Sequence, residues 1–561
     1  MKKFNKIFLV LGLVAAFSLS SCIDDLDQAP KDPNQLTNEK FKEDPEGYMN
    51  AVLAECYLSF ATTGTGGASG NANIQGFDGG MGTFQRAVFN LNEIPTDEAD
   101  WLSVSDSHMN ASVQYGVFPA NNTCIYGTYS RLTINASVCN EFIRTVQQGK
   151  FDLPEELKEK AENYCNQARV LRSLAYFYLI DLFGNVPYAD ETLPAGAVPD
   201  QYTRAEAYAK VVADLEAAAA ALPDAEPVYG YVGKDAADAL LAKFYLNAGV
   251  FTGTPQYEKC WNKCLEIIKR HQGGGFEGSG LANNYTALFA ANNDKYAAGG
   301  SNKAENELIW VIPGDAENLT AFSNASFLIN AWVTAAPGDA SYSIQASEYN
   351  MAGSGWKCML ARKQFVQKFD WYDDGTSPDM RTALWKTSLD GFEIENTGLT
   401  QNDYGNGYVA VKYTNFAYDN DGNIDLENSP VPADFSNADY AVIRLAEIYL
   451  TAAECYVVGN VGDAIEALEF VNLIRRRAGL ENWTATDLTK DNLLDERCRE
   501  LYQENCRRTD LIRFNKFAGN AYVWNFKGGV PNGTSLPASA NLYPIPQTVV
   551  ALTGYKQTTG Y

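Results

Sequence analysis

The sequence predicts a mainly α-helical protein, in which a tetratricopeptide-like scaffold of helical repeats carries a loop-rich, short-stranded ligand-binding region. Apolar residues recur at amphipathic-helix spacing in two separated regions, residues 51–272 and 439–561. Between them, residues 273–438 are rich in Gly, Asn, Asp and aromatic residues and have few long periodic runs. The hydrophobic share of 46% with 20% charged residues is that of a globular chain.

Residues 1–21 have the layout of a secretory signal. Lys2, Lys3 and Lys6 precede a stretch, residues 7–17, that carries no charge. This apolar run of about 11 residues is shorter than the roughly 20 that a membrane-spanning helix needs. We therefore expect the segment to be removed from the mature protein.

The next residues predict a lipid anchor at Cys22. Leu19-Ser20-Ser21-Cys22 resembles the lipobox of bacterial lipoproteins, in which the signal is cleaved before a cysteine whose sulfur carries a diacylglycerol. Residues 22–50 would then form a lipid-anchored linker; the alternative is a secreted protein in which Cys22 pairs or stays free. Asp24-Asp25 resembles the signal that sends Bacteroidetes-type lipoproteins to the outer face of the outer membrane, although acidic residues are also common in solvated linkers.

Charge excludes several partners. The formal net charge is −25, and it becomes −28 when the three signal lysines leave. Such a surface repels phosphate backbones and anionic lipid, so we expect no nucleic acid partner and a neutral ligand. With only two histidines, His108 and His271, zinc sites and Ser-His or Cys-His nucleophiles are disfavoured, and no cofactor is expected.

Ten cysteines besides Cys22 contain no Cys-x-x-Cys motif, and most lie among apolar helical residues. There a thiol behaves as a small core hydrophobe. Cys260 and Cys264 share a helix face four residues apart, too far for easy bridging. We expect buried thiols rather than disulfides.

The first helical region contains one long helix and several shorter ones. Residues 157–183 carry a single apolar stripe, which Gly184 and Pro187 end. The stripe consists of Ala168, Leu171, Ala175, Tyr178 and Leu179. Further helices are expected at residues 204–222, 235–248 and 257–271. A binding loop is expected at 61–110, where glycines cluster.

Two helix pairs resemble tetratricopeptide repeats. In the first, residues 235–248 and 257–271, small residues such as Ala239 and Ala242 would let the helices pack closely. The second is residues 443–458 with 461–478. We interpret their alanine and aromatic stripes as scaffold.

Acidic clusters invite other interpretations that fit less well. Residues 419–425, with Asp419 and Gly422, lack EF-hand spacing, so an Asp-Gly turn between strands is preferred over a calcium site. Asp373-Asp374-Gly375 is interpreted as another turn. Asp97 and Glu98 could indicate a glycosidase, but sequence adjacency does not set two carboxyls across a sugar.

Four motifs together resemble the SusD/RagB family of outer-membrane glycan-binding lipoproteins. They are residues 166–188, 443–454, 497–517 and 542–547 (the last reading LYPIPQ), and the resemblance runs from Cys22 to the end. It implies a non-enzymatic subunit that captures oligosaccharide at the cell surface and closes as a lid over a SusC-like TonB-dependent transporter.

Residues 89–101 and 354–369 are similar to loops of the starch-binding members, and this resemblance implies the site residues. Trp101 and Trp356 match two tryptophans of the family pattern, and Asp78 and Arg86 match its acidic and basic residues. Phe322 falls where a tyrosine is expected. The family pattern is also broken at Ser103, in place of a second tryptophan, and at Asp106, in place of an asparagine that hydrogen-bonds sugar.

These residue types suit a sugar because an aromatic ring covers the apolar face of a glucose ring while charged and amide groups bind its hydroxyls. Asp78 and Arg86 would bind hydroxyls or simply pair with each other. The polar neighbours of Trp101 and the glycines beside Trp356 predict exposure for both rings. Trp261 and Trp310 lie in apolar periodic contexts and are expected to be buried.

The leading hypothesis is a lipid-anchored subunit that binds starch or related α-glucans such as maltooligosaccharides. Ser103 and Asp106 favour an alternative in which the same fold binds a fructan, a host glycan or another plant polysaccharide. A third hypothesis is a surface-anchored hydrolase, or a structural transporter subunit without a sugar site.

Overall fold

The structure, a computed structural model, describes residues 44–561 except 65, 69–71, 103–110, 150–152, 195, 334–343, 354, 357, 372–375 and 388–407. The expected signal peptide and lipid anchor at Cys22, together with Asp106, His108 and the expected turn at Asp373, therefore lie outside the described residues.

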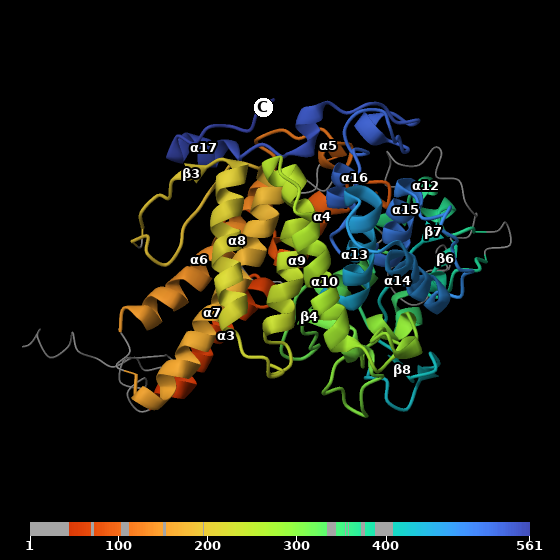
Figure 1. Cartoon of the computed structure of the whole chain (residues 1–561), viewed down its shortest axis with the longest axis horizontal. Coiled ribbons are helices and arrows are strands. Elements are labelled where there is room, and N and C mark those ends of the chain that lie inside the picture. Colours follow the sequence, from red (N-terminus) through yellow and green to blue (C-terminus); the bar gives the residue numbers. More distant parts are fainter. Residues whose placement is uncertain are drawn as a thin grey trace, which may run out of the picture.

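Long helices form a continuous row in which each packs on the next (Figure 1). The row contains α6 (Thr123–Gln147), α7 (Glu155–Phe183), α8 (Arg204–Ala221), α9 (Lys234–Thr252), α10 (Tyr257–His271), α13 (Leu445–Gly459) and α14 (Ala464–Arg477). Contact between α10 and α13 joins segments about 170 residues apart in the chain. The two predicted helical regions thus build one scaffold.

Three further helices flank the row. They are α3 (Pro45–Ala61) and α4 (Phe84–Asn92), which pack on α6, and α15 (Lys490–Leu501), which packs on α13. Shorter helices are α5 (Ala111–Gln114), α11 (Asn324–Asn330), α12 (Lys363–Gln367), α16 (Arg507–Arg513) and α17 (Gln547–Thr553). Single 3-10 turns occur at Gly80–Gly82, Phe276–Gly278, Thr286–Phe289, Ala304–Asn306, Ala346–Tyr349, Met380–Thr382, Lys527–Gly529 and Ala538–Asn541.

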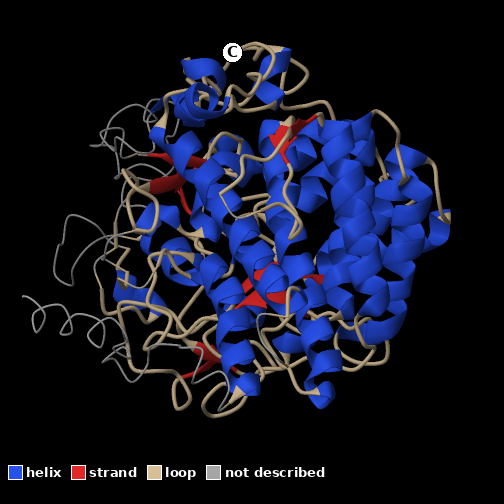
Figure 2. Ribbon diagram, turned by 90° about the vertical axis from the view of Figure 1, so that its left-hand side faces the viewer, coloured by secondary structure: helices blue, strands red, loops and turns tan. Residues whose placement is uncertain are grey.

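Strands are short and lie mostly on the side away from the helical row (Figure 2). A four-stranded antiparallel sheet has the order β1 (Ala99–Trp101), β5 (Met359–Ala361), β7 (Tyr408–Val409), β6 (Lys386–Thr387). Three antiparallel pairs complete the strands: β4 (Leu308–Ile312) with β10 (Tyr440–Arg444), β2 (Val186–Pro187) with β3 (Gln201–Tyr202), and β8 (Ala417–Tyr418) with β9 (Ile424–Asp425).

The helix-rich fold and the helices expected in it are confirmed. The apolar stripe of α7 is buried throughout, and the helix ends at Gly184, whose φ of 75° suits glycine. α8 begins with a capping box in which Thr203 and Glu206 satisfy each other's backbone amides. Both α10 and α14 end in basic residues, which the helix dipole favours.

Three expectations differ from the structure. The helix expected at 443–458 begins at Leu445, because the preceding residues form β10 and pair with β4. The linker expected at 22–50 already contains the start of α3, at Pro45. The loop expected at 61–110 contains α4, in which polar residues such as Gln85 and Asn90 are fully buried and hide the helical period.

Other expectations about packing are confirmed. All ten cysteines of the described residues are buried thiols that form no disulfide with one another. Trp261 and Trp310 are buried. Asp419 accepts the backbone amides of Asp421 and Asn423 in a turn between β8 and β9, with Gly422 at a φ of 85°. Within the described ranges no group of three or more His, Cys, Asp or Glu residues is arranged to hold a metal ion.

None of the helices in the described part of the chain is both long enough and apolar enough to cross a bilayer.

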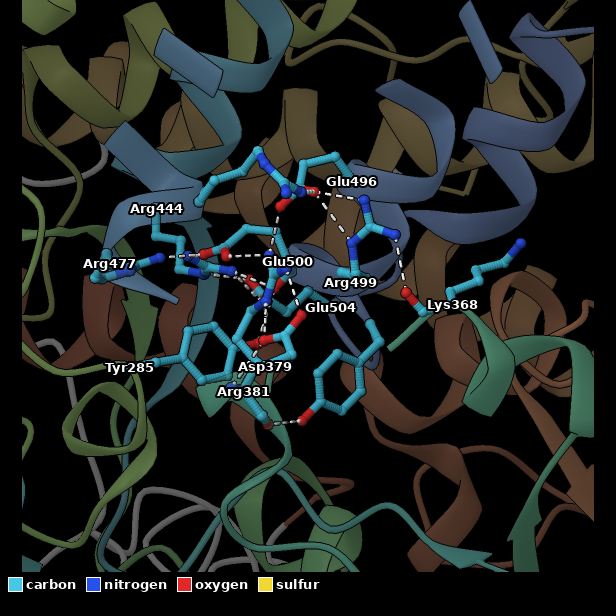
Figure 3. Close-up of polar contacts among 12 residues, drawn as sticks. Tyr285, Lys368, Asp379, Arg381, Arg444, Arg477, Glu496, Arg499, Glu500 and Glu504 are labelled. Atoms are coloured by element: carbon cyan, nitrogen blue, oxygen red, sulfur yellow. Dashed lines mark hydrogen bonds and ion pairs between the residues drawn. The ribbon is translucent and has the colours of Figure 1, made fainter. Parts of the chain in front are cut away.

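A buried ion network ties the loop-rich region to the C-terminal helices (Figure 3). Glu500 of α15 accepts hydrogen bonds from Arg444 (2.6 Å), from Arg381 (3.1 Å) and from Arg477. Burial alone would raise the pKa of Glu500, but these arginines outweigh burial and hold the pKa well below its usual range. The carboxylate is therefore ionised, and three segments of the chain converge on it.

Candidate functional site

Arg86 of α4 is the centre of the candidate site. Its side chain is largely buried, and its guanidinium carbon lies 4.7 Å from the ring centroid of Phe327 and 5.0 Å from that of Trp356. Its Nη1 donates to the carbonyl of Phe322 at 3.4 Å. Cation–π contact of this kind fixes the orientation of the guanidinium.

An aromatic cluster, Phe322, Trp356 and Phe435, lies beside this arginine. The ring of Phe322 is 5.6 Å from Trp356 at 75° and 5.1 Å from Phe435. All three side chains are half-buried, so each keeps part of its ring open to solvent. The Trp356 backbone amide donates to the Asn330 carbonyl at 2.7 Å, which holds its loop against the end of α11.

Asp78 and Gly80 complete the arrangement. Asp78 is exposed, and its Oδ1 accepts the Met81 amide at 3.1 Å. A Cβ on Gly80 would lie 3.1–3.3 Å from atoms of Arg86, Asp78 and Phe322. The absence of a side chain at Gly80 therefore lets these three groups converge.

The structure thus brings together four of the residues predicted to form the site: Asp78, Arg86, Phe322 and Trp356. Asp106 lies outside the described residues, and its place in the site stays a prediction.

The predicted exposure of Trp101 is wrong. Its side chain is 2% exposed, because β1 pairs with β5 and the ring faces Phe327 at 6.5 Å. Gln114 holds the strand by accepting from the Trp101 amide at 2.8 Å and donating to its carbonyl at 3.1 Å. Phe327 contacts both Trp101 and Trp356, so Trp101 packs behind Phe327 in the core and not at the surface of the site.

Sequence reasoning missed Phe327, Phe435 and Gly80. Phe327 lies in a short helix whose apolar run resembles ordinary core, and nothing local indicates that it faces an arginine more than 200 positions away. For Phe435 the sequence offered a signal, since this aromatic residue stands between the polar residues Asp434 and Ser436 in the loop-rich region.

The acids considered as a glycosidase pair are engaged in the core. Asp97 receives hydrogen bonds from Arg507 at 2.7 and 2.8 Å. Glu98 accepts the Gln503 amide at 3.2 Å, and burial raises its pKa to about 7. Burial, followed by the proximity of Glu98, likewise raises the pKa of Glu93 well above its usual range. At neutral pH Glu98 is therefore only partly ionised, and all three acids are buried.

Comparison with known proteins identifies the family. A family model described as "SusD family" matches residues 306–561, and one described as "Starch-binding associating with outer membrane" matches residues 89–246. Starch-binding protein SusD of Bacteroides thetaiotaomicron is 30% identical, over 97% of this chain and 96% of that protein. The chain belongs to the SusD family.

Solved structures share the SusD-family fold. A SusD superfamily protein from Parabacteroides distasonis has a TM-score of 0.64 at 20% identity, covering 94% of this chain and all of that one. Surface glycan-binding protein A from Bacteroides thetaiotaomicron, in complex with laminarihexaose, has a TM-score of 0.64 at 20% identity and covers 91% of this chain and 99% of that chain.

Proposed function

We propose that this SusD-family chain is a non-enzymatic surface lipoprotein that binds starch or related α-glucan oligosaccharides and delivers them to a SusC-like TonB-dependent transporter. The observation that carries the proposal is the convergence of the aromatic cluster, Arg86 and Asp78 around Gly80.

The chemistry of this group matches a neutral sugar. Partly open rings of the aromatic cluster can cover the C–H face of a glucose unit. Arg86 donates to hydroxyl oxygens, and the exposed Asp78 carboxylate accepts from hydroxyl hydrogens. Three rings from separate segments, set at angles to one another, suit a curved α-linked chain better than a flat one. A neutral ligand also agrees with the strongly acidic surface.

The comparisons support a glycan ligand. The relative at 30% identity is named a starch-binding protein, and a structure with the same fold was solved with laminarihexaose bound. The family resemblance and the N-terminal sequence support the remaining parts of the proposal, which are transfer to a TonB-dependent partner, the anchor at Cys22 and exposure on the outer face. Protease shaving of intact cells tests the outer-face location, since a surface protein is degraded without lysis.

Affinity electrophoresis in amylopectin gels tests the binding site. We expect Trp356→Ala to weaken binding about tenfold, equivalent to about 1.4 kcal/mol, because the indole is the largest ring of the aromatic cluster. Leu552→Ala on α17 is the control, since this side chain is 86% exposed and lies outside the site. Equal retardation of wild type and Trp356→Ala would contradict the proposed site.

A second candidate keeps the fold and role but changes the sugar to a fructan, host glycan or plant polysaccharide. The burial of Trp101 favours it, because one ring of the expected starch-binding arc does not reach the surface. A glycan array with a signal for another polysaccharide and none for α-glucans would establish this alternative.

A further inference from the structure

A hollow of about 780 Å³, separate from the aromatic cluster, lies on the loop-rich side of the molecule. It is lined by Tyr229 and by parts of three loops, residues 291, 292, 294 and 296–299, residues 313–315 and 319, and residues 427–431. Leu319 lines the hollow, whereas Phe322 belongs to the aromatic cluster. Their Cα atoms are at most about 11 Å apart, because an extended chain advances no more than about 3.6 Å per residue. The two features are therefore neighbours on one loop.

Tyr296 gives the hollow an open aromatic face. Its side chain is 69% exposed, and its ring meets Tyr229 edge to face at 5.9 Å and 90°. A large ring this exposed gains little from core packing, and a T-shaped contact covers at most one of its two faces, which leaves the other for a ligand.

The floor of the hollow is rigid. The hydroxyl of Tyr229 donates to Asp439 Oδ2 at 2.6 Å, and the Gly314 amide donates to Oδ1 at 2.7 Å. Asn293 holds the backbone of Asp439 by two further hydrogen bonds. The Tyr229 ring that supports Tyr296 is thereby fixed in place.

The walls carry polar groups suited to hydroxyls. Ala316 donates to Asn437 Oδ1 at 2.8 Å, and among the described residues the amide NH₂ of Asn437 has no hydrogen-bond partner. Asp294 and Glu427 add carboxylate oxygens. Of the described residues that line the hollow, none is Lys or Arg. An anion is therefore disfavoured, whereas a neutral polyhydroxyl chain can donate to the carboxylates and accept from the amide.

We propose that this hollow is a second oligosaccharide-binding site, with Tyr296 as its stacking platform. The choice of α-glucan as the ligand rests on the proposed function of the first site. Two neighbouring sites on one face would bind a polysaccharide with an avidity that exceeds either site alone. A short maltooligosaccharide would fill the two sites independently.

The test compares wild type, Tyr296→Ala, Trp356→Ala and the double variant of the full chain. Amylopectin gels measure avidity, and calorimetry with maltoheptaose measures the number of sites. We expect each single variant to lose about tenfold in amylopectin affinity and to retain one maltoheptaose site, and the double variant to bind neither probe. Tyr296→Phe should retain binding because the ring is kept, and Leu552→Ala should match wild type.

The outcomes separate the two proposals. The second site alone would be overturned if Tyr296→Ala matched wild type in gel retardation and in the number of maltoheptaose sites, while Trp356→Ala lost all binding. The reverse pattern would overturn the first site and leave the hollow as the binding site. A wild-type chain that binds neither probe would overturn the α-glucan assignment of both. If glycan binding in the hollow required calcium and was unchanged in Tyr296→Ala, the hollow would be a cation site, and the second-site proposal would be overturned.

Discussion

The helical scaffold and the loop-rich region are held together by different forces. Helices of the scaffold pack through alanine and aromatic side chains, as where Ala242 is fully buried on α9 beside α10. The loop-rich region is joined to the C-terminal helices through buried charges, such as Arg381 and Arg444 on Glu500. Apolar packing tolerates many sequences of similar volume, whereas a buried charge depends on its own partner. The junction between the loop-rich region and the C-terminal helices therefore depends on individual partner residues.

The largest effect is expected from breaking the ion network. Glu500→Leu should destabilise the fold by about 3–5 kcal/mol, because it leaves buried arginines without their shared carboxylate. Urea denaturation measures the change.

The exposed pair between Arg476 and Glu277 provides the control for this variant. Arg476→Met should cost no more than about 1 kcal/mol, because solvent screens the pair. If both variants cost the same, the network does not join the two regions.

The next largest effect is expected from overpacking the scaffold. Ala242→Leu places extra methylenes between α9 and α10 and should cost about 1–3 kcal/mol. Ala209→Leu on the exposed face of α8 is the matched control and should be nearly neutral. Thermal unfolding distinguishes them, and equal melting temperatures would show that close helix contact at Ala242 is not needed.

In the loop-rich region, Gly80→Ala should affect binding more than stability. The added methyl would press on Asp78 and Arg86 at 3.1–3.2 Å, so we expect several-fold weaker retardation on amylopectin. Gly274→Ala is the control, because no atom lies within 4 Å of its added Cβ. Full binding by Gly80→Ala would show that the convergence of these groups is not required.

The smallest effect is a pH dependence at Glu98. Its pKa is raised to about 7 in the folded protein, above the ordinary value of 4.5, so the folded state holds a proton that the unfolded state releases. The resulting stability is complete below pH 4.5 and is lost as pH rises through 7. Glu98→Gln should remove this dependence.

Melting temperature measured from pH 5 to 8 tests this expectation. Wild type should lose stability relative to Glu98→Gln as the pH rises, whereas surface Glu159→Gln should follow wild type throughout. Parallel curves for wild type and Glu98→Gln would show that the carboxyl is ionised across this range.

Sequence patterns predicted the scaffold better than the site for a physical reason. Helix α10 has the expected bounds, residues 257–271, because helical periodicity is encoded within one segment. The burial of Trp101 depends instead on strand pairing with residues some 260 positions away, which local polarity does not reveal. Phe327 was missed for the same reason, since its partner Arg86 comes from a helix whose buried polar residues resemble a loop.

The packing of α10 against α14 and the turn before it also constrains how the chain can fold. Trp261 of α10 meets Phe470 of α14 at 6.0 Å, and a Cβ on Gly462 would collide with the Trp261 ring. The apolar face of α10 is thus covered only by residues that follow it about 200 positions later in the chain. Contacts of such sequence separation form slowly, because a long loop must close first. A chain released before its C-terminal helices would expose this face, so assembly is completed only when the last fifth of the sequence is available.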